Sequence, residues 1–406
     1  VGFAIGSQGG EESQISPDTK LVFATYGYAI ASGLINEAKT IVLDEVHEAS
    51  MDISLARALL HKRRELGDDV KVLEMSATID AEKQAAYWAD VSPTQVYEAE
   101  GRSHPCEWRQ EKPTSRHGRG GKEVGEVVAE LIRDGKKGIA VFQAGKGEIR
   151  AAEESIRRAL EGSGLNVEVS SIHGEMDGKQ RKAAMAAPQA GSDAKIIIGT
   201  NVIESGVNIP WLDAGISSGE GKVSVYKDTG AKALELRDLP QWRLTQQQGR
   251  VNRTGPGVFV VHSEKPFDDR PEKAQPEIER APLTELIMHS AALKLNPEDL
   301  KFDSEVDKGK LIKARERLER LGLVRDDYTL TREGQYTSRL PVGPEAGAML
   351  VEAREMGKLK DAIELVAIVE AGGLRKDFRE GHGQSYGSDV FDSLAAFRKI
   401  QKAERD

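Results

Sequence analysis

The chain of 406 residues is 30% charged and only 5% aromatic, with a formal net charge of −9. This length predicts two to four domains, and no apolar run approaches the ~20 residues that cross a bilayer, so no membrane-spanning helix is expected. Overall charge does not predict a nucleic-acid partner, and any such surface must be a local basic groove. The single Cys106 and the lack of a secretory signal predict a cytoplasmic setting.

A strand-to-helix turn is predicted near the N-terminus. Residues 1–5 and 20–24 are expected to form short strands around a polar loop, and Thr25-Tyr-Gly27 opens a helix that runs through residues 29–35. A hydroxyl and backbone amides at such a turn can hold a phosphate of a nucleic-acid strand. Threonine also caps helices for structural reasons, so both interpretations stay open here.

Two adjacent carboxylates follow the next apolar run. Residues 39–43 are expected to form a buried parallel strand, and Asp44, Glu45 and His47 come after it. Ligands bind at the carboxyl ends of strands in open α/β sheets. One carboxylate there can hold Mg²⁺ through its water shell, and the next can orient an attacking water. The alternative is an acidic helix N-terminus, which the helix dipole favours without any ligand.

Two hydroxyl side chains end the following strand. That strand is predicted over residues 70–74, after a helix with an apolar face and a basic last turn. Ser76 and Thr78 can bridge neighbouring groups such as His47. Capping of a helix over residues 81–88 explains them equally well on local grounds.

Strands and helices then alternate beyond a polar boundary at residues 102–105 and 111–121. The predicted elements are helix 123–133, strand 138–142, helix 148–160, strand 167–172, a helix from Asp177, strand 194–199 and strand 258–262. Such alternation predicts a parallel sheet with helices on both faces.

Polar and basic residues stand out late in this unit. Thr200 and Asn201 begin a polar turn after a strand. Further on, Arg250 and Arg253 are predicted to share one helical face beside Gln246. Arginines so placed can stabilise charge on a transferring phosphoryl group, whereas the alternative is an ordinary basic helix end.

The rest of the chain predicts a hairpin and helical modules. Residues 223–236 are expected to form a β-hairpin. Helices are expected over residues 284–293, 308–321, 346–355, 360–370 and 388–402. The first two, with the turn that follows Leu330, suggest a winged helix, which either binds nucleic acid or only packs against its neighbours. No metal-ligand cluster, Ser/His/Asp triad or repeat is visible.

In this order the motifs resemble those of the DEAH-box helicases, an RNA-helicase family of superfamily 2. The matching stretches are Asp44-Glu-Val-His47, Ser76-Ala-Thr78, Gly101-Arg-Ser-His-Pro105, Val141-Phe-Gln-Ala-Gly145 with Glu148-Ile149, Ile172-His-Gly174, Thr200-Asn-Val-Ile-Glu204-Ser205, Gln246–Arg253, Pro276-Glu-Ile-Glu-Arg280 with Leu283, and Pro344–Gly373. Single motifs are weak signals, but six in the right order are specific, and the resemblance runs essentially from end to end.

The resemblance implies ATP and Mg²⁺ as cofactors. The residues that it assigns to catalysis and nucleotide binding are Asp44, Glu45, His47, Ser76, Thr78, Gly206, Gln246, Arg250 and Arg253. Asp44 and Glu45 would hold Mg²⁺, and Glu45 would also polarise the hydrolytic water. His47, Ser76 and Thr78 would couple the nucleotide state to domain closure, while Gln246, Arg250 and Arg253 would face the γ-phosphate.

The resemblance also implies contacts with nucleic acid. The residues that it assigns to the nucleic-acid backbone are Thr25, Gly27, Arg102, Thr200 and Asn201. Recognition would rest on shape and 2′-hydroxyl groups rather than base edges. The hairpin over residues 223–236 matches the strand-separating hairpin of the family.

The sequence departs from the family at three positions. Gln247 replaces the usual Arg of the sixth motif, Asn252 replaces its usual Gly, and Ser217 stands where an Asp follows the fifth motif. These changes bear on substrate and coupling more than on the chemistry.

The absence of a phosphate-binding loop is a larger departure from the family. Such a loop needs Gly-x-x-x-x-Gly-Lys followed by Ser or Thr. The Gly-Lys pairs start at Gly121, Gly135, Gly145, Gly178, Gly221, Gly309 and Gly357, and none is followed by Ser or Thr. In the family this loop lies upstream of the segment that matches Val1–Phe3. We therefore expect a chain truncated at the front, and at the back before a small oligonucleotide-binding barrel. The 406 residues alone are expected to be inactive.

The predicted fold class is α/β. It comprises two RecA-like parallel-sheet domains, the first incomplete over residues 1–103 and the second over 104–265, then a winged helix over 266–340 and the start of a helical ratchet domain over 341–406. The implied function is ATP-dependent translocation and unwinding of nucleic acid, with single-stranded RNA favoured over DNA and a protein cofactor as a further partner. The alternatives are a nucleic-acid- or partner-binding module that has lost its ATPase, and a DNA-directed motor.

Overall fold

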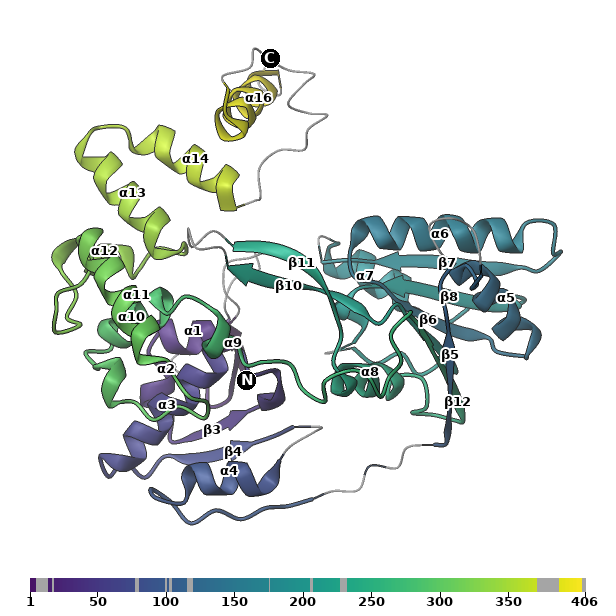
Figure 1. The fold of residues 1–406 in the computed structure, drawn as a ribbon, viewed down its shortest axis with the longest axis horizontal. Helices are drawn as coiled ribbons and strands as arrows, with labels where there is room; N and C mark the ends of the chain where they lie inside the picture. Colours follow the sequence, from purple (N-terminus) through teal and green to yellow (C-terminus); the bar gives the residue numbers. More distant parts are fainter. Residues whose placement is uncertain are drawn as a thin grey trace. The chain divides into compact units, whose positions relative to one another are not determined.

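The computed structural model describes residues 1–4, 14–16, 18–76, 80–98, 101, 104–114, 120–174, 176–204, 207–226, 232–370 and 387–403. The chain divides into two compact units, whose elements are labelled in Figure 1. The first unit comprises residues 1–94 and 276–406, and the second comprises residues 95–275. The chain therefore leaves the first unit, builds the second and returns to the first.

The N-terminal part of the first unit contains two pairs of parallel strands and a long buried helix. Its elements are β1 (Gly2–Ala4), β2 (Val22–Ala24), α1 (Tyr26–Ala31), α2 (Leu34–Glu37), β3 (Thr40–Leu43), η1 (Val46–Glu48), α3 (Met51–Glu65), β4 (Lys71–Glu74) and α4 (Ala81–Trp88). Strand β1 pairs with β2, and β3 pairs with β4. Leu55, Leu59 and Leu60 of α3 lie in the core, and Leu300 reaches this core from the returning part of the chain.

Two predictions for this part need correction. The strand over residues 39–43 is parallel, as expected, but it is not buried throughout. Val42 and its register partner Leu73 are each 50% exposed, so the described residues leave one face of this strand pair uncovered. The single helix expected over residues 29–35 is two short helices, because Gly33 adopts a left-handed φ of 80° that ends the first.

The second unit is built on one six-stranded sheet. Its elements are β5 (Cys106–Glu111), α5 (Val124–Arg133), β6 (Gly138–Phe142), α6 (Lys146–Leu160), β7 (Val167–Ile172), α7 (Gly178–Met185), β8 (Ala194–Gly199), η2 (Asn201–Ile203), β9 (Ala214–Ser217), β10 (Glu220–Tyr226), β11 (Lys232–Asp238), α8 (Gln241–Gln248) and β12 (Gly257–His262). The strand order is β5-β12-β9-β6-β8-β7, and every pairing is parallel. The antiparallel hairpin β10–β11 lies outside this sheet.

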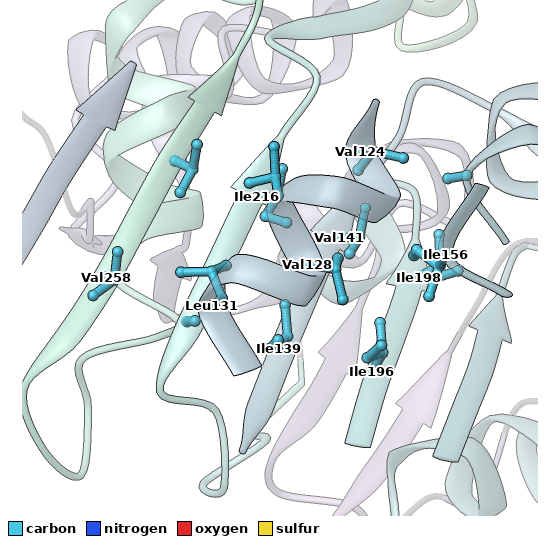
Figure 2. Packing of buried hydrophobic residues seen from close by; sticks show 14 of the residues in the cluster. Val124, Val128, Leu131, Ile139, Val141, Ile156, Ile196, Ile198, Ile216 and Val258 are labelled. Atoms are coloured by element: carbon cyan, nitrogen blue, oxygen red, sulfur yellow. The ribbon is translucent and has the colours of Figure 1, made fainter. Parts of the chain in front are cut away.

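Alternate residues of the central strands face opposite sides of this sheet. Ile139 and Val141 of β6 pack with helices α5 and α6 in the cluster that Figure 2 shows. Ala140 and Phe142 belong to a second cluster, which includes Leu244 of α8. Burial of both faces explains the continuous apolar runs that predicted these strands, and it confirms helices on both sides of a parallel sheet.

The sequence pattern missed two strands of the sheet. Strand β5 was not predicted, because its residues Cys-Glu-Trp-Arg-Gln-Glu form no apolar run and lie at a half-exposed edge of the sheet, between the two polar boundary segments. Strand β9 has only four residues, Ala-Gly-Ile-Ser, and offers too short an apolar run to be recognised. Both strands pair with β12, so the sheet is wider than predicted.

The returning part of the first unit is helical. Its elements are α9 (Glu277–Arg280), α10 (Thr284–Ala292), η3 (Pro297–Asp299), α11 (Lys308–Arg320), α12 (Arg332–Thr337), α13 (Pro344–Glu355), α14 (Leu359–Glu370) and α16 (Asp389–Ala403). An antiparallel bridge joins Val324 and Leu330 after α11. The five predicted helices are present, while their assignment to winged-helix and ratchet domains stays a prediction. Among the described residues, no helix combines the length and apolar character needed to cross a membrane.

Candidate nucleotide and nucleic-acid site

The two acidic residues lie at the carboxyl end of β3, as the sequence predicts. Glu45 adopts a left-handed φ of 55°, which is uncommon for a residue with a side chain. Its backbone N–H donates to Oδ1 of Asp44 at 2.9 Å. Such backbone conformations cost of order 1–3 kcal/mol and are concentrated at functional sites. The tight turn leaves the carboxylate of Asp44 exposed and that of Glu45 36% exposed.

His47 joins this turn to the end of β4. Its Nδ1 lies 2.9 Å from Oγ of Ser76 and 3.5 Å from Oε2 of Glu45. Backbone hydrogen bonds of Met75 with Leu43 and Val46 continue the strand pairing and hold the two turns side by side. The structure therefore brings Glu45, His47 and Ser76 together. It also favours bridging over capping, because Asp80 is the residue that caps α4.

Thr25 begins α1 but does not cap it. Thr25 is exposed, and its side chain makes no capping hydrogen bond, so the structural explanation for this threonine is not supported. Two residues later, a Cβ on Gly27 would lie only 2.9 Å from Oδ2 of Asp52. A side chain at this position would have to displace the carboxylate of Asp52 on α3.

Tyr26 lies between these two residues and was missed by the sequence reasoning. Its hydroxyl donates to the backbone carbonyl of Asp44 at 2.6 Å, joining the start of α1 to the end of β3. Burial, and then the charges of Asp44 and Glu74, raise the pKa of Tyr26, so the hydroxyl stays protonated and able to donate. The side chain of Tyr26 thus connects the predicted nucleic-acid turn to the backbone of Asp44, whose carboxylate is the predicted Mg²⁺ ligand.

In the second unit, Thr200 and Asn201 lie at the carboxyl edge of the sheet. The N–H of Gln143 donates to the carbonyl of Gly199 at 2.8 Å, so the ends of β6 and β8 are adjacent. Thr200 starts the short helix η2, and Asn201 is exposed. This is the edge at which open parallel sheets bind ligands.

The arginines of the sixth motif do not share a helical face, contrary to the prediction. Helix α8 ends at Gln248, and Gly249 is its C-cap, so Arg250 and Arg253 lie in the turns beyond. Nη1 of Arg250 donates to the carbonyl of Val207 at 2.8 Å, and Nη1 of Arg253 lies 3.5 Å from Oδ1 of Asn208. Both arginines are thereby directed towards the loop that follows the fifth motif. Gln246 remains within α8.

A buried ion pair joins that motif to α8. The Nε and Nη2 atoms of Arg243 donate to the two carboxylate oxygens of Glu204 at 2.8 and 2.7 Å. Glu204 is only 2% exposed, and both of its carboxylate oxygens accept hydrogen bonds from this one partner. One helical turn further on, Gln247, the first departure in the sixth motif, is also buried.

Asn252, the second departure in the sixth motif, also has a structural role. Its Nδ2 donates to the carbonyl of His104 at 2.6 Å, and the N–H of His104 donates to the carbonyl of Asn252 at 3.1 Å. The side chain fixes the segment that leads into β5. Three other predicted site residues, Thr78, Arg102 and Gly206, lie outside the described residues.

The donor groups suit a magnesium ion that keeps most of its water. Among the described residues there is no cluster of three or more His, Cys, Asp or Glu side chains that would hold a metal by themselves. Mg²⁺ in nucleotide sites needs only one or two carboxylates in addition to phosphate oxygens. The exposed carboxylate of Asp44 at a strand end fits that requirement.

Comparison with known proteins finds similarity to helicases. The model of the helicase conserved C-terminal domain matches residues 123–255. The chain is 27% identical over 381 residues to the ATP-dependent RNA helicase HrpA of Escherichia coli, and 28% identical over 380 residues to HrpB of the same organism. These matches cover 89% and 91% of this chain, but only 28% and 46% of the two relatives.

Solved structures agree with these matches. The crystal structure of the E. coli DEAH/RHA helicase HrpB is similar with a TM-score of 0.79 and 25% identity, over 98% of this chain and 51% of that chain. A second HrpB structure, described as a DExH-box NTPase, has a TM-score of 0.77 at 23% identity and supports the fold alone. The chain carries a helicase C-terminal domain and is a homologue of the DEAH-box helicases HrpA and HrpB.

Proposed function

We propose that the chain is part of an ATP-dependent helicase that translocates along single-stranded nucleic acid, RNA in preference to DNA. The observation that carries this proposal is the group formed by Glu45, His47 and Ser76 beside Asp44 at the ends of β3 and β4. Its carboxylates suit Mg²⁺–nucleotide chemistry, and its hydrogen bond joins two motifs that the family uses for coupling.

Each residue of the first unit has a role in this proposal. Mg²⁺ bound with ATP would neutralise charge on the phosphate oxygens. Asp44 would contact the water shell of the metal, and Glu45 would accept a hydrogen bond from the attacking water and orient it. His47 and Ser76 would transmit the position of this turn to the end of β4, where Thr78 follows.

The second unit would contribute cations and nucleic-acid contacts. Gln246, Arg250 and Arg253 would stabilise negative charge on the γ-phosphate, with Gly206 beside the nucleotide. The residues proposed to contact the nucleic-acid backbone are Thr25, Gly27, Arg102, Thr200 and Asn201. Closure of the two units on ATP would drive translocation. We propose further that residues 266–340 and 341–406 serve as winged-helix and ratchet domains, that the setting is cytoplasmic, and that a protein cofactor assists.

A second candidate function is a binding module without ATPase activity. The observation in its favour is that no Gly-Lys pair in these 406 residues is followed by Ser or Thr. Without the amides and lysine of a phosphate loop, Asp44 and Glu45 have no phosphate held in place to act on. We therefore propose that the 406 residues alone hydrolyse little ATP.

The dependence of ATP hydrolysis on RNA or DNA distinguishes an RNA helicase from a binding module and from a DNA-directed motor. RNA and DNA binding by the 406 residues would be measured by fluorescence anisotropy, and ATP hydrolysis by the complete protein that contains them, with poly-U RNA or DNA. An RNA helicase predicts salt-dependent RNA binding and hydrolysis that RNA stimulates more than DNA does. Binding without hydrolysis by the complete protein would favour the binding module, and stronger stimulation by DNA would favour a DNA-directed motor.

A further inference from the structure

Arg270 is a buried cation that contacts both ends of the β10–β11 hairpin. The residue is 3% exposed, and its Nη1 donates to the carbonyls of Gly219 at 2.6 Å and Leu239 at 3.0 Å. Gly219 precedes β10 and Leu239 follows β11, and these two residues also pair through the N–H of Leu239. The guanidinium therefore binds the last backbone pair at the base of the hairpin, which Figure 1 shows projecting from the sheet of this unit.

The other side of the guanidinium is attached to the end of β12. Nη2 donates to Oγ of Ser263 at 2.8 Å and to the carbonyl of Lys265 at 3.0 Å. Among the residues that the structure describes, the nearest carboxylate is that of Asp238, 4.0 Å away. A fully buried charge is costly unless hydrogen bonds compensate it, and here backbone carbonyls supply most of the compensation. This side chain thus joins the hairpin to the sheet.

Gly219 leaves the space that the guanidinium occupies. Its φ is 67°, and a Cβ at this position would lie 2.4 Å from Nη2 of Arg270. A side chain here would both strain the backbone and displace the arginine. Gly219 and Arg270, which are 51 positions apart in the sequence, are therefore sterically complementary at the base of the hairpin.

The backbone around Arg270 also contacts the start of α8. Its carbonyl accepts a hydrogen bond from Nε2 of Gln241 at 3.0 Å, and the carbonyl of Pro271 accepts one from the N–H of Gln241 at 2.9 Å. Helix α8 carries Gln246 and leads to Arg250. The turn at Arg270 therefore contacts the hairpin through its side chain and the helix of the sixth motif through its backbone.

We propose that Arg270 is a positioning residue that holds the hairpin to β12 and α8, so that movement of α8 displaces the hairpin and separates paired strands. This inference rests on the proposed function and extends it to a residue outside the matching motifs. A hairpin without this attachment would move independently of α8, and ATP hydrolysis would continue without strand separation.

The test compares Arg270→Lys with the wild type in the complete protein that contains this chain. Lysine keeps the charge, but a single ammonium cannot bind the hairpin and the end of β12 in the same planar geometry. We expect RNA-stimulated ATP hydrolysis to stay within about twofold of the wild type, and unwinding of a forked RNA duplex to fall at least tenfold. Hydrogen exchange should accelerate in β10 and β11 but not in β9 or β12.

Two further variants keep the test decisive. Gly219→Ala keeps arginine at position 270 but displaces its guanidinium, so it should reproduce the effect, and it replaces Arg270→Lys if that variant does not fold. Ser263→Ala is the matched control, since it removes one contact and leaves both carbonyls of the hairpin bound. Unchanged unwinding, or ATP hydrolysis and unwinding that fall in parallel, would overturn the proposal. If the wild type shows neither activity, the proposed function fails, and the exchange measurement alone decides whether Arg270 holds the hairpin.

Discussion

At the residue scale, the contact between His47 and Ser76 connects the two strand-end motifs of the first unit. It joins residues 29 positions apart through side chains, in addition to the backbone pairing of the strands. Its loss would leave Asp44 and Glu45 in their turn. We therefore expect it to affect coupling rather than metal binding or binding of nucleic acid.

Ser76→Ala tests this expectation. A hydrogen bond of this kind contributes about 1 kcal/mol, so RNA-stimulated ATP hydrolysis by the complete protein should fall by roughly fivefold, with RNA affinity unchanged. Steady-state hydrolysis and fluorescence anisotropy measure the two quantities, and Ser76→Thr, which keeps the hydroxyl, serves as the control. Equal losses of RNA affinity and hydrolysis would argue against a coupling role.

Sequence motifs identified some site residues and not others for a physical reason. Asp44, Glu45 and His47 lie within four positions of one another, so one short stretch reveals them. Tyr26 and Arg243 act through partners 18 and 39 positions away. No local sequence pattern distinguishes a tyrosine that donates a hydrogen bond to a distant carbonyl from one that packs in a hydrophobic core.

At the element scale, helix α8 is attached to the fifth-motif turn by the pair Arg243–Glu204. The pair is bidentate, with one partner buried and the Arg243 side chain 30% exposed. Removing Arg243 would leave the Glu204 carboxylate buried without its partner.

Arg243→Ala should therefore destabilise the second unit by roughly 2–3 kcal/mol, less than the 3–5 kcal/mol of a fully buried pair and more than a surface pair contributes. Urea unfolding followed by tryptophan fluorescence measures this change. Glu204→Gln combined with Arg243→Gln should recover part of the loss, because no unpaired buried charge remains. A destabilisation below about 0.5 kcal/mol for Arg243→Ala would mean that the pair does not hold α8.

The elements themselves were predicted unevenly. Strands buried on both faces, such as β6 and β8, were predicted with the bounds that the structure shows. Strand β5 was missed because an edge strand alternates polar and apolar residues, and the extent of α8 was misjudged because the helical pattern continues past its glycine cap. The tertiary structure determines whether β5 forms a strand and where α8 ends, and local sequence patterns do not show either.

At the scale of the whole molecule, a polar network attaches the returning part of the chain to the rest of the first unit. Arg57, which is fully buried, donates to Glu74 at 2.7 Å and also contacts Asp303 from the returning chain. Nearby, Nζ of Lys301 lies 2.9 Å from both carboxylate oxygens of Asp90. These contacts make residues beyond 300 part of the first unit.

The pair Asp90–Lys301 predicts a pH dependence of stability. Hydrogen bonds from Lys301 and then His61 lower the pKa of Asp90 from 3.8 to about 2. Because the folded pKa is the lower one, this stabilisation is complete above the unfolded pKa and is lost as the pH falls from about 4 to about 2. Asp90→Asn should lack this part of the acid dependence, as urea unfolding between pH 6 and pH 2.5 would measure. If the free energy of unfolding falls in parallel with pH in the wild type and in Asp90→Asn, this prediction is contradicted.

We propose that Glu45 orients the hydrolytic water of an RNA-dependent ATPase. The most direct test of this proposal is ATP hydrolysis by the complete protein that contains these 406 residues, with and without poly-U RNA, for the wild type and Glu45→Gln. We predict hydrolysis that RNA stimulates, a loss of roughly 10²–10⁴-fold in Glu45→Gln, and RNA binding that the substitution leaves intact. Hydrolysis that is indifferent to RNA, or that survives in Glu45→Gln, would contradict the account.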